Sequence, residues 1–300
     1  MKTGTTSLAR IVDEYPSLAF FALTIAFSWT AWILTFSVAE PRSGVGMIGI
    51  IVGAFGPGVA GATMVRLRGE SVRSWLRSIL SPRRGLRWYG LAAAVPVAGT
   101  VGVAVIVFSV AGVPSIDTFA QIAPLFAFNA VLATAFTGGN EEIGWRGFAL
   151  PHLQTRFNAL KASVILGCVW AFWHIPMFVY GVYSMSPVLY SVSVVSFSII
   201  LTSYYNSSDG FVLGAVLLHG MINATVNVPG QAIGGVDTVQ IPYAGILAVV
   251  FGSFALAVVI RYGGETLCRS DVVRPRWTAE EPADESVRSL DGLHRTNPSE

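Results

Sequence analysis

Two adjacent glutamates, Glu141 and Glu142, stand inside a long apolar stretch of the sequence. A carboxylate in the middle of a bilayer costs roughly 2.5–3.5 kcal/mol on insertion scales, so a pair of them needs a reason. Arg146 follows Glu142 by one helical turn, and the two predict an ion pair on one helix face. Glu141 points about 100° away from that face. Trp145 shares the face of Glu141 and is predicted to line a pocket. Glu141, which has no partner on its own helix face, is the candidate reactive group.

Two histidines in other apolar stretches could join Glu141. His174 lies in the segment VWAFWHIPMF, and His219 lies in VLLHGMINAT with Asn223 one turn later. A single histidine in an apolar helix is usually a hydrogen-bonded core residue. Two histidines, an asparagine and a glutamate together favour one shared site.

The chemistry open to this set is acid–base hydrolysis. A carboxylate and two imidazoles can activate water, and His and Asn can donate hydrogen bonds to an oxyanion. Glu141, His174 and His219 could also hold a zinc ion, and the sequence is compatible with zinc or with no metal. It contains neither the HExxH motif of zinc peptidases nor the GxSxG motif of serine hydrolases.

The elements that carry these residues are long apolar segments. Only 12% of the residues are charged and 53% are hydrophobic, whereas soluble domains carry about 25% charged residues. A membrane-spanning helix needs about 20 mostly apolar residues. We predict an all-α polytopic membrane protein with eight transmembrane helices, over residues 17–38, 45–65, 89–112, 122–150, 160–180, 187–205, 210–228 and 240–260.

Two of these helices carry distinct signals. The fourth runs into the glutamate pair and is predicted to be one long, tilted or kinked helix that ends at Pro151. The second contains many small residues over Gly53–Ala62, which predict close helix packing, and Pro57 predicts a kink. Residues 1–262 form the predicted transmembrane domain, and residues 263–300 form a polar cytoplasmic tail that is predicted to be disordered.

The basic residues predict the orientation in the membrane. Seven arginines lie in the segment 66–87, which is therefore expected in the cytoplasm. With eight spans both termini are also cytoplasmic, and only Arg42 of the nineteen basic residues faces outward. The same segment contains Trp75, Leu76, Ile79 and Leu80, which could dip into the membrane surface, although a role in topology alone is the simpler interpretation.

The depth of the polar residues supports one shared site. At about 1.5 Å per residue, Glu141 and His219 lie roughly 15 Å from the cytoplasmic helix ends. His174 and Asn223 lie roughly 20 Å from those ends on the same scale. We therefore expect all four in one layer that opens to the cytoplasmic side.

Three motifs in order give the chain a family resemblance. Glu141 to Arg146 matches EExxxR, and His219 to Asn223 matches HxxxN/D. Between them, Trp170 to His174 matches FxxxH except that Trp170 replaces the phenylalanine, which affects pocket shape more than chemistry. The motifs lie within residues 122–228, and over this core the chain resembles the CAAX-prenyl protease and bacteriocin-processing (Abi) family of membrane proteins.

The resemblance implies an intramembrane endopeptidase with an eight-helix fold. By this resemblance Glu141 activates water, and His174 positions or polarises it. His219 and Asn223 stabilise the oxyanion, while Glu142 and Arg146 hold the motif helix. Trp145 and Trp170 are assigned to the substrate pocket. The expected partners are a peptide or membrane-protein substrate and the lipid bilayer, with no nucleic acid.

The composition, rich in Arg, Gly and Ala, favours the plasma membrane of a prokaryote and a membrane-associated or leader peptide over a prenylated substrate. Two alternatives to a protease stay open. One is a non-catalytic immunity or scaffold protein of the same fold. The other, a transporter, is disfavoured because the sequence shows no inverted repeat.

Overall fold

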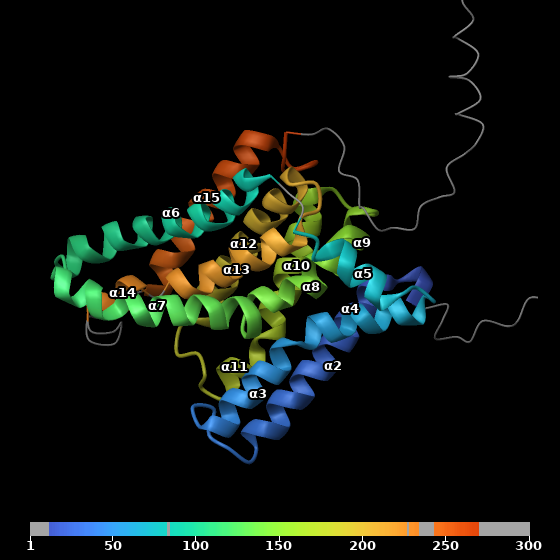
Figure 1. Cartoon of the computed structure of the whole chain (residues 1–300), viewed down its shortest axis with the longest axis horizontal. Coiled ribbons are helices and arrows are strands. Elements are labelled where there is room, and N and C mark those ends of the chain that lie inside the picture. Colours follow the sequence, from blue (N-terminus) through green and yellow to red (C-terminus); the bar gives the residue numbers. More distant parts are fainter. Residues whose placement is uncertain (1–11, 83–84, 227, 234–242, 270–300) are drawn as a thin grey trace, which may run out of the picture.

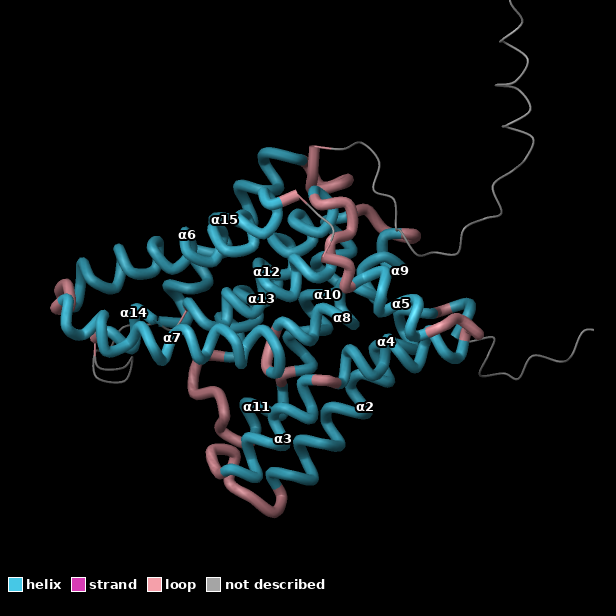
Figure 2. Tube along the Cα trace, in the orientation of Figure 1, coloured by secondary structure: helices cyan, strands magenta, loops and turns pink. Residues whose placement is uncertain are grey.

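The chain folds into a bundle of membrane-length helices (Figure 1). The computed structural model describes residues 12–82, 85–226, 228–233 and 243–269, and these residues contain no strand (Figure 2). Eight helical stretches among them are long and apolar enough to cross a membrane, which confirms the predicted all-α polytopic fold. They are α2 (Pro16–Phe36), α3 and α4 (Gly44–Ala54 and Gly56–Leu67), α6 (Leu86–Ala111), α7 with the short turns η1, α8, η2 and α9 (Ile116–Phe136, Gly139–Glu141, Glu142–Gly144, Trp145–Ala149 and Leu150–Gln154), α10 and α11 (Ala159–Trp173 and Ile175–Val179), α12 (Pro187–Ser207), α13 and α14 (Val212–Thr225 and Val228–Ala232) and α15 (Tyr243–Tyr262).

The second span breaks at Phe55, between α3 and α4, which confirms the predicted kink. Pro57 has no N–H to donate to the carbonyl of Gly53 one turn earlier, and Ser28 Oγ donates to that carbonyl instead at 2.7 Å. The small residues do allow close packing. A Cβ added at Gly53 would lie only 2.0 Å from the Trp32 indole nitrogen.

The fourth span differs from its prediction. It breaks after Phe136, continues as a 3₁₀ turn and a π-helical turn, and passes through Pro151 to end at Gln154. The prediction that Pro151 ends the helix was therefore wrong. The carbonyl of Gly147, which a residue with an N–H at position 151 would normally engage, accepts the indole N–H of Trp75 at 3.0 Å.

That indole comes from the amphipathic helix α5 (Val72–Ile79), part of the basic segment. Trp75 and Ile79 are buried in the hydrophobic core, and Leu76 and Leu80 pack against it. The apolar face of α5 therefore packs against the rest of the protein. Cys168 and Cys268 are not joined to each other in a disulfide.

The first part of the predicted tail differs from a disordered segment. Within residues 263–269, Leu267 is fully buried, and its carbonyl accepts a hydrogen bond from Ser203 Oγ at 2.7 Å. The main-chain N–H of Ala159 donates to the carbonyl of Glu265 at 2.9 Å. The rest of the tail, from residue 270, and the start of the chain lie outside the described residues.

Helix α13 lies in the middle of the bundle, between α6 and α7 in the view of Figure 1, and it also packs against α12. Two glycines, which have no side chain, allow α7 and η1 to approach α13 closely. A Cβ added at Gly220 would lie 2.2 Å from Thr134 Oγ1, and one added at Gly139 would lie 2.5 Å from the Val216 carbonyl oxygen. This close approach brings the glutamate pair beside the helix that carries His219.

Candidate active site

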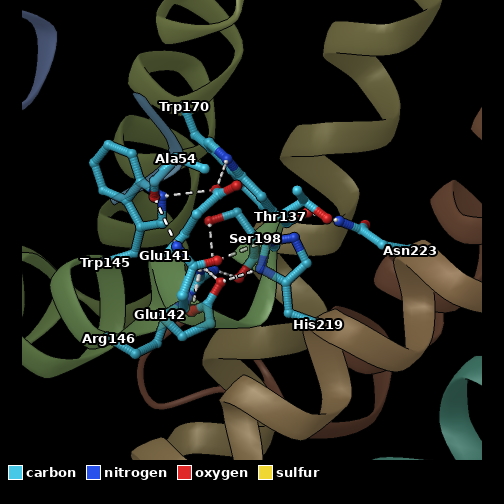
Figure 3. A network of polar contacts seen from close by, with 12 residues as sticks. Ala54, Thr137, Glu141, Glu142, Trp145, Arg146, Trp170, Ser198, His219 and Asn223 are labelled. Atoms are coloured by element: carbon cyan, nitrogen blue, oxygen red, sulfur yellow. Dashed lines mark hydrogen bonds and ion pairs between the residues drawn. The ribbon is translucent and has the colours of Figure 1, made fainter. Parts of the chain in front are cut away.

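Glu141 lies at the end of η1, buried with 4% of its surface exposed. Its Oε2 accepts hydrogen bonds from Nε1 of Trp170 at 2.9 Å and from Nε1 of Trp145 at 3.3 Å (Figure 3). The expected shared face with Trp145 is present. The carboxylate nevertheless has a partner that helix spacing could not supply, because Trp170 comes from α10. Its Oε1 accepts no hydrogen bond from the described residues, and it is the oxygen available to a water molecule.

Glu142 forms the predicted ion pair with Arg146, and both side chains are fully buried. Arg146 Nη1 lies 3.0 Å from Glu142 Oε2, and Arg146 Nη2 donates to the carbonyl and Oγ of Ser198, both at 3.2 Å. Glu142 has a second role that the sequence did not indicate. Its Oε1 lies 2.8 Å from His219 Nδ1, so the ion pair also orients this imidazole (Figure 3).

His219 and Asn223 present nitrogen atoms to one place. A Cβ added at Gly138 would lie 3.3 Å from His219 Nε2 and 2.3 Å from Asn223 Nδ2, so both atoms border this glycine. Asn223 Nδ2 donates one hydrogen to the Thr137 carbonyl at 2.9 Å, and an amide carries a second hydrogen. Because Nδ1 of His219 is held by Glu142, its Nε2 faces away from the ion pair.

His174 is buried with 6% exposure at the end of α10. Its Nδ1 lies 2.8 Å from the Trp170 carbonyl oxygen, which leaves Nε2 for other partners. The Trp170 ring lies 4.9 Å from that of His219 and 6.2 Å from that of His174, measured between centroids. Glu141, His174 and His219 thus come together around Trp170.

The turn that carries the glutamates is held by residues that sequence reasoning missed. Asn140 Oδ1 accepts from the Gly138 N–H at 3.1 Å, and Asn140 Nδ2 donates to the Ala54 carbonyl at 3.0 Å. Ala54 is the last residue of α3, beside the break caused by Pro57. A polar residue directly before the glutamate pair was the available signal for Asn140.

Two tyrosines border His174 and were also missed. The centroids of the Tyr190 and Tyr183 rings lie 5.3 Å and 5.9 Å from that of His174. Gly181, with a φ of 68°, turns the chain so that the Val182 and Tyr183 N–H groups bond to the Met177 carbonyl. Burial first, and the Glu141 carboxylate second, raise the pKa of Tyr183 to about 12, so its phenol is neutral near the site.

A third histidine, His152, lies in α9 with 6% of its surface exposed. Its Nδ1 lies 2.8 Å from the Phe148 carbonyl oxygen, and Arg68 Nη1 lies 3.3 Å from its Nε2. These contacts belong to the packing of α9, away from Glu141.

A metal ion requires a set of ligating side chains that converge on one point. Within the described ranges, no three His, Cys, Asp or Glu side chains are placed so that they could hold a metal ion. Glu141, His174 and His219 gather around an indole, and the Trp170 N–H occupies one carboxylate oxygen of Glu141. These side chains therefore fit a site for acid–base catalysis without a metal ion better than they fit a zinc site.

Residues 123–225 match the family model of the type II CAAX prenyl endopeptidases, described as Rce1-like. The chain is also similar to CAAX prenyl protease 2 from Methanococcus maripaludis, with 30% identity over 105 residues. That alignment covers 32% of this chain and 37% of the relative, so it spans about a third of either protein. The matched stretch 123–225 contains all three motifs, and the predicted family resemblance is confirmed.

Proposed function

Since residues 123–225 belong to the family of Rce1-like CAAX prenyl endopeptidases, we propose that the protein is an intramembrane endopeptidase that uses Glu141 to activate water. The observation that carries the proposal is the Glu141 carboxylate, which is buried in a membrane-length span. One of its oxygens accepts from two indoles, and the other accepts no hydrogen bond from the residues that the structure describes. Burying a carboxylate inside a membrane costs free energy, so a carboxylate found there indicates a functional site.

In the proposed reaction, Glu141 takes a proton from water while the water oxygen attacks the carbonyl carbon of the scissile peptide bond. His174 Nε2 orients the water, since its Nδ1 is fixed by the Trp170 carbonyl. The negative charge that develops on the carbonyl oxygen is stabilised by the second amide hydrogen of Asn223 and by a hydrogen bond from His219 Nε2. Glu141 then passes its proton to the departing amine as the C–N bond breaks.

Glu142 and Arg146 serve this reaction by positioning. The carboxylate of Glu142 lies against His219 Nδ1 and fixes the direction of the ring. Arg146 neutralises Glu142 and links it to Ser198 on α12. Trp145 and Trp170 both donate hydrogen bonds to Glu141. We propose that their main role is to position this carboxylate, beyond any contact with the substrate.

The proposed substrate is a membrane-anchored peptide, and the bilayer is the medium from which it enters. The names of the matching family and relative refer to prenylated CAAX substrates, so prenylated C-terminal peptides belong in any test beside leader peptides. We propose a multi-pass protein of a prokaryotic plasma membrane. The site opens toward the side that carries the arginine-rich segment 66–87, which the charge asymmetry assigns to the cytoplasm.

Cleavage of a peptide library by the purified chain tests this function. The library should contain prenylated and unprenylated peptides, and the products should be identified by mass spectrometry. Wild type is expected to cleave members that Glu141→Ala and His219→Ala leave intact. Arg42→Ala, on the loop between α2 and α3, is the matched control. Equal cleavage by wild type and both site variants would refute the proposal.

A further inference from the structure

A groove of about 380 Å³ lies apart from the glutamate pair, which contributes no residue to its lining. Its sides are α6 and α15, which lie next to each other in Figure 1, and its floor is formed by α12 with Leu218 of α13. Most of the lining is apolar, and Ser203 and Ser207 of α12 contribute hydroxyl groups. Leu91 and Val95 of α6 face Phe254 and Val258 of α15 across it.

The groove has the length of one membrane leaflet. It runs along α6 from Trp88 to Ala98, which is about 15 Å at 1.5 Å per residue. The hydrocarbon core of a bilayer is about 30 Å thick, so one leaflet supplies about 15 Å of acyl chain. The groove ends where α6 and α15 touch, since a Cβ added at Gly99 would lie 2.5 Å from the Phe251 ring.

The mouth of the groove carries positive charge. The guanidinium of Arg87 lies 4.8 Å from the centre of the Trp88 ring, and that of Arg261 lies 5.3 Å from the centre of the Tyr262 ring. Trp88 and Tyr262 both line the groove, so the two arginines flank its opening. Both arginines are exposed, and neither pairs with an acidic side chain in the part of the chain that the structure describes.

We propose that this groove binds one anionic phospholipid, with an acyl chain between α6 and α15 and its phosphate between Arg87 and Arg261. Guanidinium groups bind phosphate oxygens through paired, charge-assisted hydrogen bonds. The two guanidinium groups carry a charge of +2. A zwitterionic headgroup has no net charge to set against it, whereas a headgroup with one net negative charge neutralises half of it. Each arginine near a membrane surface contributes roughly a fivefold preference for an anionic lipid. The bound chain would contact α13 one residue before His219.

Fluorescence quenching by brominated lipids tests the site in the full chain. The protein is placed in phosphatidylcholine nanodiscs that contain a small fraction of brominated phosphatidylglycerol or brominated phosphatidylcholine. Trp88 is one of eight tryptophans, and its signal is isolated by subtracting the spectrum of Trp88→Phe. We expect half-maximal quenching of Trp88 at a roughly 25-fold lower fraction of brominated phosphatidylglycerol than of brominated phosphatidylcholine, because each of the two arginines contributes about fivefold.

Three comparisons decide the outcome. Arg87→Gln/Arg261→Gln should abolish the preference for phosphatidylglycerol, while Arg73→Gln/Arg77→Gln, which removes the same charge from exposed positions on α5, should keep it. Ala98→Leu should weaken quenching by both lipids, because it fills the inner end of the groove. Equal quenching by the two lipids in wild type, or displacement by millimolar inorganic phosphate alone, would overturn the proposal. No part of this test depends on peptidase activity.

Discussion

Trp170 is the residue at which this chain departs from the FxxxH motif of its family, and it gives the sharpest test of the site. The change Trp170→Phe restores the phenylalanine of the motif and removes the indole N–H that donates to Glu141 Oε2 at 2.9 Å. The remaining donor, Trp145 Nε1, lies at 3.3 Å, which is beyond the usual length of a strong hydrogen bond. The carboxylate would then be free to turn away from the water that it activates.

The size of the effect follows from the charge of the acceptor. A hydrogen bond to a charged group contributes about 1.5–3 kcal/mol. If that free energy stabilises the productive orientation in the transition state, its loss lowers kcat/KM by roughly 10- to 150-fold at 1.36 kcal/mol per tenfold. Trp145→Phe should have a smaller effect, because its hydrogen bond is longer.

The assay compares peptide cleavage by Trp170→Phe with cleavage by Trp173→Phe. Trp173 is equally buried and next to His174, but its Nε1 has no hydrogen-bond partner among the described residues. Trp173→Phe therefore removes a similar volume without removing a hydrogen bond. We expect comparable melting temperatures and a loss of kcat/KM in Trp170→Phe alone. A Trp170→Phe enzyme that stays within twofold of Trp173→Phe would refute this role.

Three further predictions concern residues that hold the site in place. Arg146→Met leaves Glu142 charged and buried without its partner, so it should lower the free energy of unfolding by about 3–5 kcal/mol. The double variant Glu142→Gln/Arg146→Met should regain most of this free energy in denaturant titrations, and equal losses in the two variants would contradict the prediction. Gly138→Ala puts a methyl group about 2.3 Å from Asn223 Nδ2, so cleavage should fall more than roughly tenfold with little change in melting temperature. Trp75→Phe removes a hydrogen bond to the π-helical turn and should destabilise the protein by about 1 kcal/mol, and an unchanged unfolding midpoint would count against that contact.

Membrane spans were the feature most accessible from the sequence, because hydrocarbon demands about 20 apolar residues from each of them. The kink at Phe55 was also predictable, since Pro57 removes a helical hydrogen bond through its own covalent structure. The path of the fourth span was not. Its π-helical turn depends on Trp75, a donor that arrives from a helix about seventy residues earlier in the chain.

In the site too, contacts within one helix were predictable from the sequence and contacts between helices were not. Helical spacing identified Glu142 with Arg146 and Glu141 with Trp145, because partners one turn apart lie on one face. It could not identify the contact of Trp170 with Glu141 or of His219 with Glu142, since each joins two different helices. Those contacts change the assignments. Glu141 is held by two indoles, and Glu142 is both an ion-pair partner and the group that orients His219.

The central claim is that the Glu141 carboxylate acts as the base, and Glu141→Gln tests it most directly. Glutamine keeps the size of the side chain and can still accept the hydrogen bonds of Trp145 and Trp170, so the fold should be unchanged in thermal unfolding. General-base catalysis typically contributes 10²–10⁴-fold, and we expect cleavage of the best library peptide to fall by roughly that factor. A folded Glu141→Gln protein that cleaves the peptide at close to the wild-type rate would contradict the account.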